Sequence, residues 1–533
     1  MNNNVGVSRS AESMDTSTRA DGLNDRSLGW LRFMWDKATT PDDWSDQGEP
    51  HPWWDRYSEP PMCAFPRFDL AEMSYVLPMM LEATPAWREP YVRILDELAR
   101  RYTTFWGAAD WNTLIGPDPN VDKYPPEWLA MAPEQLRGRY ALPGWTANGV
   151  EPWGLQPDPV GSDGNLFYRG WLNLLLSIRR YVSAEPQEDA PFEVSGYQNR
   201  TFTWTHKRIA HFISDQLVAR PQGTHCENTK VWMFCMSAAG LGLQLYDALL
   251  GTTVNQPFLD WVAFAEKHYM GRDRRGRLDW VAFYYDPIEA SMLSFPGRLG
   301  GYGALCLLHY LYPQDARLGE ELYECAMRQL GWNDPSVPVI QWADDPQMLS
   351  TAMWMARELG DTTTWDRLRE ISESQFEPRF FGEDNTRFAY WFGLDEPWPR
   401  GQFNATMAMI ECAEPGAWSR VFNAPRTHLH AQPTLRGVDY PTIGVRRTHH
   451  DLERQVLEVD TFAATPAHRG GPTTFTVENL PVDALRVRLD GRPHDGWRRT
   501  GPDKVEIDLA VDSHHLELAY AQRPNLDPYD RRA

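Results

Sequence analysis

The sequence predicts a mainly α-helical protein, an (α/α)6 barrel of helical hairpins followed by a C-terminal β-sandwich. Three observations predict this class. About twelve helical stretches between residues 67 and 420 pair off as hairpins. In several pairs an apolar helix rich in small residues precedes an amphipathic, charged one, as expected for buried inner and exposed outer helices. After residue 425 the periodicity changes to two, with turn signals at short spacing.

The twelve predicted helical stretches include clear examples of both inner and outer helices. The clearest inner helices are MSAAGLGLQLYDALLG and RLGGYGALCLLHYL, and the clearest outer ones are LGEELYECAMRQL and TTTWDRLREISESQ. A proline should kink the first stretch. In chain order the predicted helical stretches are 68–83, 87–106, 165–183, 201–220, 229–250, 256–269, 298–311, 316–330, 347–359, 362–375, 402–412 and 416–422.

The predicted strands are short runs of alternating polar and apolar residues separated by turns. They are GVRRTHHD, QVLEVDTFAATP, TTFTVENLP, ALRVRLDGRP, KVEIDLAVD and HLELAYA. We therefore expect a polar, disordered N-terminus over 1–27, a barrel over 28–424, a β-sandwich over 425–524 and a tail over 525–533. A Trp- and Pro-rich insertion at 107–163 interrupts the barrel, and loops of this length usually carry function or cover a site.

Composition excludes several classes of function. Of 533 residues, 52 are Lys or Arg and 73 are Asp or Glu, so the net charge of −21 disfavours nucleic acid and anionic membrane surfaces. We expect no membrane insertion, because no predicted helix offers the ~18 uncharged apolar residues of a spanning segment. Six cysteines without an apolar leader do not indicate a disulfide framework, so we expect a cytoplasmic protein with reduced thiols.

Aromatic residues are unusually frequent, with 24 Trp, 21 Tyr and 22 Phe. Many must pack in the core, because an indole ring buries a large area. The surplus nevertheless indicates an aromatic-lined concave surface, as in sites for sugars, cations or terpenoid chains.

The segment HCENTKVWMFC opens an apolar inner helix and contains two thiols and an acid. On one continuous helix Cys226 and Cys235 would face opposite sides, because nine residues at 100° each make 900°. Both can face one cavity only if Cys226 lies in the loop before the helix, with Asn228 or Thr229 as the N-cap. A thiol at a helix N-terminus beside Glu227 could exchange protons. The competing interpretation is a buried structural cysteine.

Other chemistries have less support in the sequence. Cys-x8-Cys lacks zinc spacing, and the histidines of the β-region, His428, His430 and the pairs 449–450 and 514–515, are expected to be exposed, so we predict no metal site. No Gly-rich phosphate loop precedes a helix.

The runs GNLFYRGWLNLLLSIRRY and HCENTKVWMFCMSAAGLGLQLYDALLG together resemble the linalool dehydratase/isomerase family. Comparable YxGHLNL and Cys-Glu-x7-Cys stretches occur in that family, and TPAW…FWGAADW and GRLGGYGALCLL resemble it more thinly. The resemblance covers about half of the chain. It implies an (α/α)6 barrel, a cyclic homo-oligomer with the cavity near a subunit interface, and no metal or organic cofactor. The implied reaction eliminates water from a tertiary allylic alcohol or shifts its hydroxyl.

The resemblance also assigns site residues. It places the catalytic thiols at Cys226 and Cys235, the neighbouring acid at Glu227 and a cavity tyrosine at Tyr302, with a second tyrosine position at Phe68. The family's histidine is Trp171 here. Further candidates are Tyr168 and Trp232 for substrate binding, and Asp55, Tyr57 and Cys63 for a group that serves a neighbouring subunit.

These residues suggest a mechanism for an apolar alcohol. A neutral acid, either thiol or carboxylic acid, protonates the leaving hydroxyl, aromatic faces such as Trp171, Trp232 and Tyr302 stabilise the allylic cation, and a base removes the neighbouring proton. Trp171 and Tyr302 could equally be core aromatic residues.

Two other functions stay open. Barrels of this kind followed by a β-sandwich also resemble glycoside hydrolases and polysaccharide lyases, in which two carboxylates act together. Candidate acids for such chemistry are Asp110, Asp163, Asp286, Asp344 and Asp345. A non-catalytic binder of an apolar ligand is the third possibility.

Overall fold

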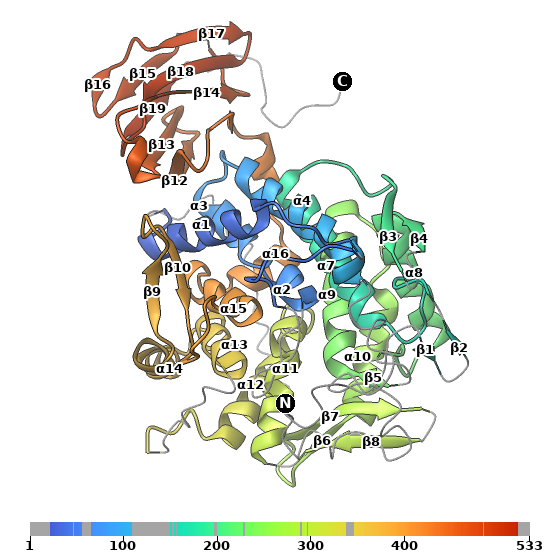
Figure 1. Cartoon of the computed structure of the whole chain (residues 1–533). Coiled ribbons are helices and arrows are strands. Elements are labelled where there is room, and N and C mark those ends of the chain that lie inside the picture. Colours follow the sequence, from blue (N-terminus) through green and yellow to red (C-terminus); the bar gives the residue numbers. More distant parts are fainter. Residues whose placement is uncertain are drawn as a thin grey trace, which may run out of the picture.

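The computed structural model describes residues 22–45, 47–55, 66–108, 150–151, 154–155, 157–196, 200–226, 230–287, 290–295, 297–336, 346–482 and 484–520. Within these ranges a helical body precedes a C-terminal β-rich region, as the sequence predicted (Figure 1). The helices are α1 (Asp25–Thr39), α2 (Pro66–Glu72), α3 (Leu77–Ala83), α4 (Glu89–Thr103), α5 (Phe105–Ala108), α7 (Leu166–Ser183), α8 (His206–Ala219), α9 (Met233–Leu250), α10 (Gln256–His268), α11 (Arg298–Leu311), α12 (Ala316–Leu330), α13 (Pro346–Glu358), α14 (Thr362–Gln375), α15 (Gly401–Cys412) and α16 (Ala417–Asn423).

The most buried helices contact one another in a closed sequence. Helix α2 contacts α7, α7 contacts α9, α9 contacts α11, α11 contacts α13, α13 contacts α15, and α15 returns to α2. Small residues permit the closest of these approaches. A Cβ added to Gly242 of α9 would come within 2.9 Å of the Leu174 backbone nitrogen in α7. Longer side chains at this position would therefore separate the two helices.

Helix α9 is the one described helix that is long and apolar enough to cross a membrane by length and composition. In the structure 67% of it is buried inside the protein, between α7 and α11. A core helix of a globular body passes the same test, and the location of α9 is that of a core helix.

Three predicted helices differ from the observed ones. The stretch expected over 68–83 is two helices, because Pro78 has no N–H and its ring crowds the preceding turn. Residues 201–204 form strand β4 (Thr201–Trp204), paired with β3 (Phe192–Ser195), since alternating threonine and aromatic residues favour a strand. Helix α8 starts only after Thr205, whose side chain accepts a hydrogen bond from the Arg208 N–H.

The helix expected from residue 229 begins at Met233. Strand β5 (Val231–Trp232) precedes it and pairs with Tyr284 and Tyr285 of β7 (Leu278–Asp286). The N-cap is Trp232 rather than Asn228 or Thr229, which lie outside the described residues. The other strands of the helical body are β1 (Val150–Glu151), β2 (Gly154–Leu155), β6 (Met270–Arg272), β8 (Ser291–Ser294), β9 (Pro378–Phe381) and β10 (Arg387–Tyr390).

Helix α1 begins inside the segment that was expected to be disordered up to residue 27. The Asn24 side chain accepts from the Ser27 N–H, which caps the helix. Arg26 forms ion pairs with Glu373 and Glu411. These partners are far away in the sequence, so the polar composition of the N-terminus did not indicate that this segment is ordered.

The C-terminal region contains two antiparallel sheets. One has the strand order β11-β14-β18-β17 and the other β12-β13-β19-β15-β16. Alternate residues of both sheets enter one buried core, as the period of two predicted. The strands are β11 (Thr434–Arg436), β12 (Ile443–Asp451), β13 (Val456–Ala463), β14 (Pro472–Glu478), β15 (Arg486–Leu489), β16 (Arg492–Pro493), β17 (Trp497–Gly501), β18 (Lys504–Ala510) and β19 (His515–Ala519).

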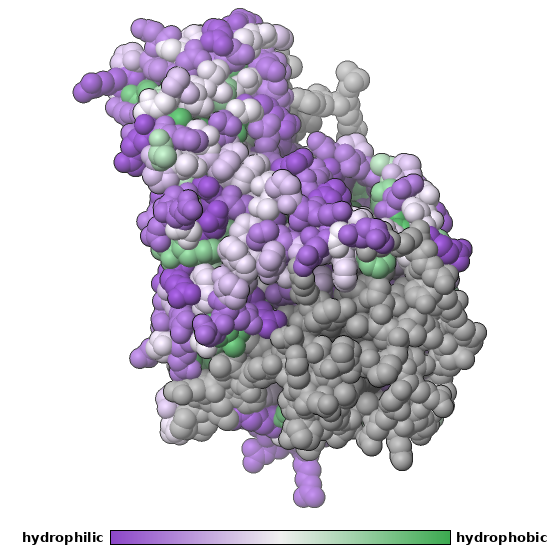
Figure 2. Space-filling model, in the orientation of Figure 1, coloured by the Kyte–Doolittle hydropathy of each residue, from purple (hydrophilic) through white to green (hydrophobic). Residues whose placement is uncertain are grey.

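The β-rich region is docked on the helical body. The ring of Trp87 lies 5.4 Å from that of Tyr440, and the Leu435 N–H donates to the Ala86 carbonyl at 2.7 Å. On the face shown in Figure 2 the described surface is mainly hydrophilic, and its apolar residues form small separate patches.

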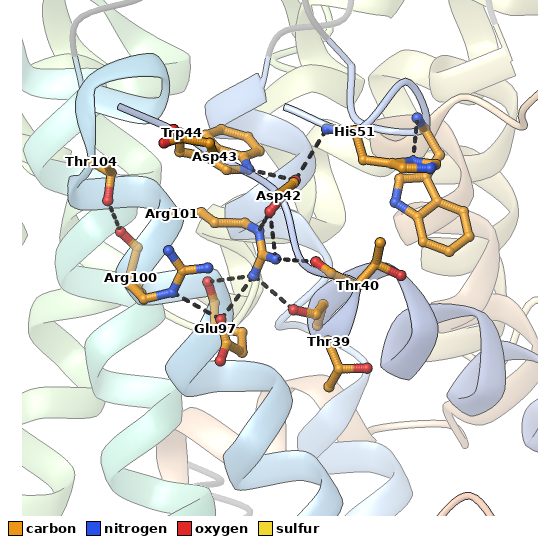
Figure 3. A network of polar contacts seen from close by, with 12 residues as sticks. Thr39, Thr40, Asp42, Asp43, Trp44, His51, Glu97, Arg100, Arg101 and Thr104 are labelled. Atoms are coloured by element: carbon orange, nitrogen blue, oxygen red, sulfur yellow. Dashed lines mark hydrogen bonds and ion pairs between the residues drawn. The ribbon is translucent and has the colours of Figure 1, made fainter. Parts of the chain in front are cut away.

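A buried arginine fixes the segment that follows α1 (Figure 3). The Arg101 guanidinium donates to the carbonyls of Ala38 and Thr40 at 2.7 and 3.0 Å and to the Asp42 carboxylate at 2.8 Å. Asp42 also accepts from the Trp44 indole at 2.8 Å. These contacts hold the chain in place as it runs toward Asp55.

A fully buried ion pair joins α1 and α2. Lys37 Nζ lies 2.6 Å from Asp69 Oδ2, and both side chains are 0% exposed. The Asp55 N–H donates to the same oxygen at 3.1 Å. The Asp55 carboxylate in turn accepts from the N–H groups of Gly401 and Gln402 at the start of α15, both at 3.0 Å.

We expect Lys37→Met to lower the free energy of unfolding by about 3–5 kcal/mol, because it leaves the Asp69 carboxylate buried without its counter-charge. Urea denaturation followed by circular dichroism measures this. Lys267→Met, an exposed position on α10, serves as the control and should change stability little. Equal midpoints for the two variants would show that the buried pair does not stabilise the fold.

Candidate functional site

The two cysteines of the HCENTKVWMFC segment meet in the structure. Cys235 lies in the first turn of α9, while Cys226 lies before the helix in an extended segment bridged to Asn165 and Lys230. Their Sγ atoms are 3.3 Å apart, and both residues are buried. Cys226 therefore lies before the helix, which is the condition under which the two thiols can face the same side. Glu227, the neighbouring acid, lies outside the described residues.

The thiol pair rests on the first turn of α7. The Phe167 N–H points at Cys226 Sγ at 3.3 Å, so a helix N-terminus faces that sulfur. The Phe167 ring lies 6.1 Å from the Phe68 ring. The first turn of α7 and the loop before α9 are thereby held against each other at this sulfur.

An apolar cavity of about 260 Å³ lies beside this segment. Trp232 and Phe234, which precede Cys235 in the sequence, form part of its wall together with Phe68 of α2. Neither Cys226 nor Cys235 is among the described lining residues, but Cys235 directly follows Phe234 of the wall in the sequence. The complete set of described lining residues is Phe68, Trp232, Phe234, Ala282, Phe283, Gly303, Cys306, Leu307, His309, Gln347, Met348, Thr351 and Gln402.

Trp171 lies directly behind the cavity and is fully buried. Its ring centroid is 5.3 Å from that of Phe68 and 5.0 Å from that of Phe234. Its indole N–H donates to the Tyr310 hydroxyl at 3.1 Å. The tryptophan that stands where the resembling family has a histidine therefore supports the wall and orients a phenol.

The other predicted residues lie in different surroundings. Tyr168 packs on Tyr102 at 4.9 Å and donates its hydroxyl to the Tyr102 carbonyl, so it is a core residue away from the cavity. Tyr302 packs 6.1 Å from Trp332 and is outside the described lining of the cavity. Asp55 caps α15 of its own chain. Tyr57 and Cys63 lie outside the described residues.

Two of the acids considered for carbohydrate chemistry are engaged in ion pairs. Burial acts to raise the pKa of Asp163, but the hydrogen bond from His225 and the ion pair with Arg220 outweigh it and hold that pKa well below its usual range. Asp286 lies 3.2 Å from the buried Lys230 ammonium. Asp110, Asp344 and Asp345 lie outside the described residues.

A polar cluster next to the cavity was missed by the sequence analysis. Tyr310 is its centre, since its hydroxyl bonds that of Tyr75 at 2.9 Å and lies 3.5 Å from Glu72 Oε1. The Gln402 amide N–H donates to the same Glu72 oxygen at 3.4 Å. The available signal was a titratable residue within a largely apolar helical stretch, Asp69 and Glu72 in FDLAEMSYVL and His309 in LCLLHYL.

Burial controls the protonation of this cluster. It raises the pKa of Glu72 to about 8, against hydrogen bonds from Gln402 and Tyr310 that lower it, so the carboxylic acid is mainly neutral at pH 7. Burial lowers the pKa of His309 to about 3, so its imidazole is neutral. The cavity therefore borders neutral polar groups. Within the described ranges no group of three or more His, Cys, Asp or Glu could hold a metal ion.

Comparison with known proteins confirms the resemblance inferred from the sequence. Residues 146–389, under half of the chain, match the family model described as linalool dehydratase/isomerase. This range contains Trp171, both thiols and α11, but not Glu72 or Gln402.

Among solved structures, a GH127 β-L-arabinofuranosidase from Geobacillus stearothermophilus T6 is similar at 11% identity. The alignment covers 94% of this chain and 76% of that one with a TM-score of 0.24, and nothing is inferred from it.

The elevated pKa of Glu72 predicts a pH-dependent stability. The folded protein keeps a proton that the unfolded chain releases above about pH 4.5, so this contribution is complete below pH 4.5 and is lost toward pH 8. Relative to Glu72→Gln, we expect the free energy of unfolding of the wild type to fall by up to about 1.4 kcal/mol per pH unit between these values.

Urea denaturation at intervals between pH 5 and 8.5 measures this slope. Glu320→Gln, an exposed substitution on α12, should keep the wild-type slope. Parallel curves for the wild type and Glu72→Gln would contradict a neutral Glu72.

Proposed function

We propose that this chain, which resembles linalool dehydratase/isomerase over residues 146–389, is a lyase/isomerase that dehydrates or isomerises an alkenol or terpenoid-like alcohol by acid–base chemistry. The observation that supports this most is the contact of Cys226 and Cys235, 3.3 Å apart beside an aromatic-lined cavity. The cytoplasmic location and the homo-oligomer expected from the sequence belong to the same proposal.

We further infer that the helical body is an (α/α)6 barrel. The closed series of contacts among α2, α7, α9, α11, α13 and α15 supports an inner ring of six. Outer helices contact this ring from outside, as α12 contacts α11 and α14 contacts α13. The thiols then lie where α7 and α9 begin, and the cavity lies near the starts of α2, α9, α13 and α15 and beside the second half of α11.

The proposed reaction begins with a proton. A thiol protonates the hydroxyl oxygen as the C–O bond breaks, both bonding electrons leave with water, and an allylic cation remains. A thiolate then takes the proton from the neighbouring carbon, whose C–H electrons form the new double bond. Because one sulfur loses a proton and the other gains one, transfer between the two sulfurs restores the starting state. For isomerisation, water adds instead at the far end of the allyl group, and the thiolate takes the proton that the added water releases.

The cavity wall suits the charge that develops. Indole and phenyl faces stabilise a cation by roughly 0.5–2 kcal/mol each without forming a bond to it. Phe68, Trp232 and Phe234 line the cavity, and Trp171 lies behind them. No organic cofactor or metal takes part in this proposal.

The alternatives have weaker support. A carbohydrate enzyme needs two carboxylates available for proton transfer, whereas Asp163 and Asp286 are held in ion pairs. A non-catalytic binder of apolar ligands would use the same cavity and leave the thiol pair without a role.

The proposal is tested by incubating purified protein with a panel of allylic and tertiary alcohols and following alkenes and rearranged alcohols by gas chromatography. We expect Cys235→Ala and Cys226→Ala each to lower turnover by about 10²–10⁴-fold, the usual contribution of a general acid or base.

Cys325→Ala is the matched control, because Cys325 is also buried but lies on α12, away from the cavity. It should keep wild-type turnover. Full activity in Cys235→Ala would exclude the thiol mechanism. Release of reducing sugar or unsaturated uronate from polysaccharides, with no alcohol converted, would favour the carbohydrate enzyme instead.

A further inference from the structure

Two sulfur atoms lie side by side in the wall of the apolar cavity. Cys306 of α11 and Met348 of α13 both line the cavity, and both are partly exposed. Cys306 Sγ lies 3.7 Å from Met348 Sδ. Neither Cys226 nor Cys235 is among the described lining residues, so the cavity has a thiol of its own.

The distance between these sulfur atoms fits two ligands of one metal ion. A tetrahedral ion with metal–sulfur bonds of about 2.3 Å holds two sulfur atoms about 3.8 Å apart. The observed 3.7 Å agrees with this separation, so little movement of α11 or α13 is needed for one ion to contact both. Sulfur atoms in plain packing contact have a similar separation, so the neighbouring groups decide between the two interpretations.

His309 supplies a nitrogen beside the sulfur pair. It follows Cys306 by three residues on α11, and residues at this spacing are neighbours on a helix surface. His309 lines the same cavity and is 5% exposed. Its Nδ1 atom is enclosed and has no hydrogen-bond partner in the described part of the chain, whereas Nε2 is not enclosed in this way. The Nε2 atom is therefore the ring nitrogen that reaches the cavity.

The protonation states of these groups permit metal binding. Burial lowers the pKa of His309 to about 3, so its imidazole is neutral and keeps a lone pair for an ion. The Met348 thioether carries no proton. The Cys306 thiol releases its proton to solvent as the metal–sulfur bond forms, so the bound site gains one negative charge, on that sulfur.

This single charge selects the ion. The described lining of the cavity contains no Asp, Glu, Lys or Arg, and its one histidine is neutral. A monovalent cation and one thiolate are neutral together, whereas Zn²⁺ would leave a net positive charge in apolar surroundings, which is costly. Thiolate and thioether sulfur are soft ligands, and they favour Cu(I).

We propose that Cys306 Sγ, Met348 Sδ and His309 Nε2 form a binding site for Cu(I) in the wall of the cavity. The set includes a thioether, which is why no group of three among His, Cys, Asp and Glu reveals it in the ranges that the structure describes. Its ligands come from two helices, so no spacing in the sequence predicts it. The site goes beyond the proposed function and uses neither Cys226 nor Cys235.

Competition with a chelator tests the proposal. The Cys226→Ala/Cys235→Ala double variant of the full chain is the starting protein, because two thiols 3.3 Å apart could themselves take Cu(I). The protein is titrated without oxygen into the coloured complex of Cu(I) with bicinchoninate, and the loss of colour reports transfer. We expect one Cu(I) to be bound per chain. Retention of all Cu(I) by the chelator overturns the proposal.

Substitutions in the double variant test each ligand. We expect Cys306→Ser to weaken Cu(I) binding by more than about 100-fold, and Met348→Leu and His309→Phe each by at least about tenfold, since even outer partners of a metal typically contribute 10–100-fold. Met348→Leu conserves volume, and urea denaturation checks that it folds like the starting protein.

Met353→Leu is the matched control, because Met353 also lies on α13 but is buried and outside the described lining of the cavity. It should keep the affinity of the double variant. A loss in Cys306→Ser without a loss in Met348→Leu means that a lone thiolate binds the ion, and this overturns the site. An equal loss in Met353→Leu overturns it as well.

X-ray absorption at the copper edge gives a second readout. We expect two sulfur neighbours at about 2.3 Å and one nitrogen at about 2.0 Å, with one sulfur missing in Met348→Leu. A single sulfur neighbour in the double variant contradicts the proposal. Turnover of allylic alcohols is measured separately on the wild type, so loss of the copper site leaves the proposed reaction standing, and the reverse.

Discussion

The buried ion pair between Lys37 and Asp69 is the interaction on which the packing of α1, α2 and α15 depends. A carboxylate and an ammonium without solvent are stable together only if every remaining polar atom near them is positioned well. Here the Asp55 N–H adds to the pair, and the Asp55 carboxylate caps α15. Gln402, the second residue of that helix, then contacts Glu72 of α2. These contacts within the chain orient helices α1, α2 and α15 relative to one another without a ligand.

Much of the fold could be predicted from the sequence because burial imposes periodicity. Helices such as α9 and α11 are apolar on all sides, and outer helices such as α12 are amphipathic, so their types and approximate bounds were predictable. The errors occur where long-range pairing overrides local preference. Residues 201–204 and 231–232 are strands because β3 and β7 lie beside them, and Asp25 begins a helix because Arg26 finds distant carboxylates.

The candidate site was predictable only in part, for the same reason. The spacing of Cys226 and Cys235 showed that they could meet only if Cys226 lay before the helix. The structure satisfies this condition because α9 begins only at Met233. Spacing could not assign Tyr168 to the core or Asp55 to a helix cap, because both roles depend on partners far along the chain. His309 and Gln402 lie on different helices, and nothing in their separate sequence contexts indicated that they line one cavity or that Gln402 bonds Glu72 of a third helix.

The contact between α2 and α15 closes the series of inner helices, and it can form only late in the synthesis of the chain on the ribosome. Helix α2 ends at Glu72, and its neighbour α15 begins at Gly401. The side of α2 that faces α15 therefore stays uncovered until more than 300 further residues have been made, which at roughly 5–20 residues per second lasts at least some 15 seconds. Contacts of such sequence separation form late and slowly. During that interval Asp69 and Glu72 of α2 lack their contacts with the first residues of α15, so the series of inner helices closes only after nearly the whole helical body has been made.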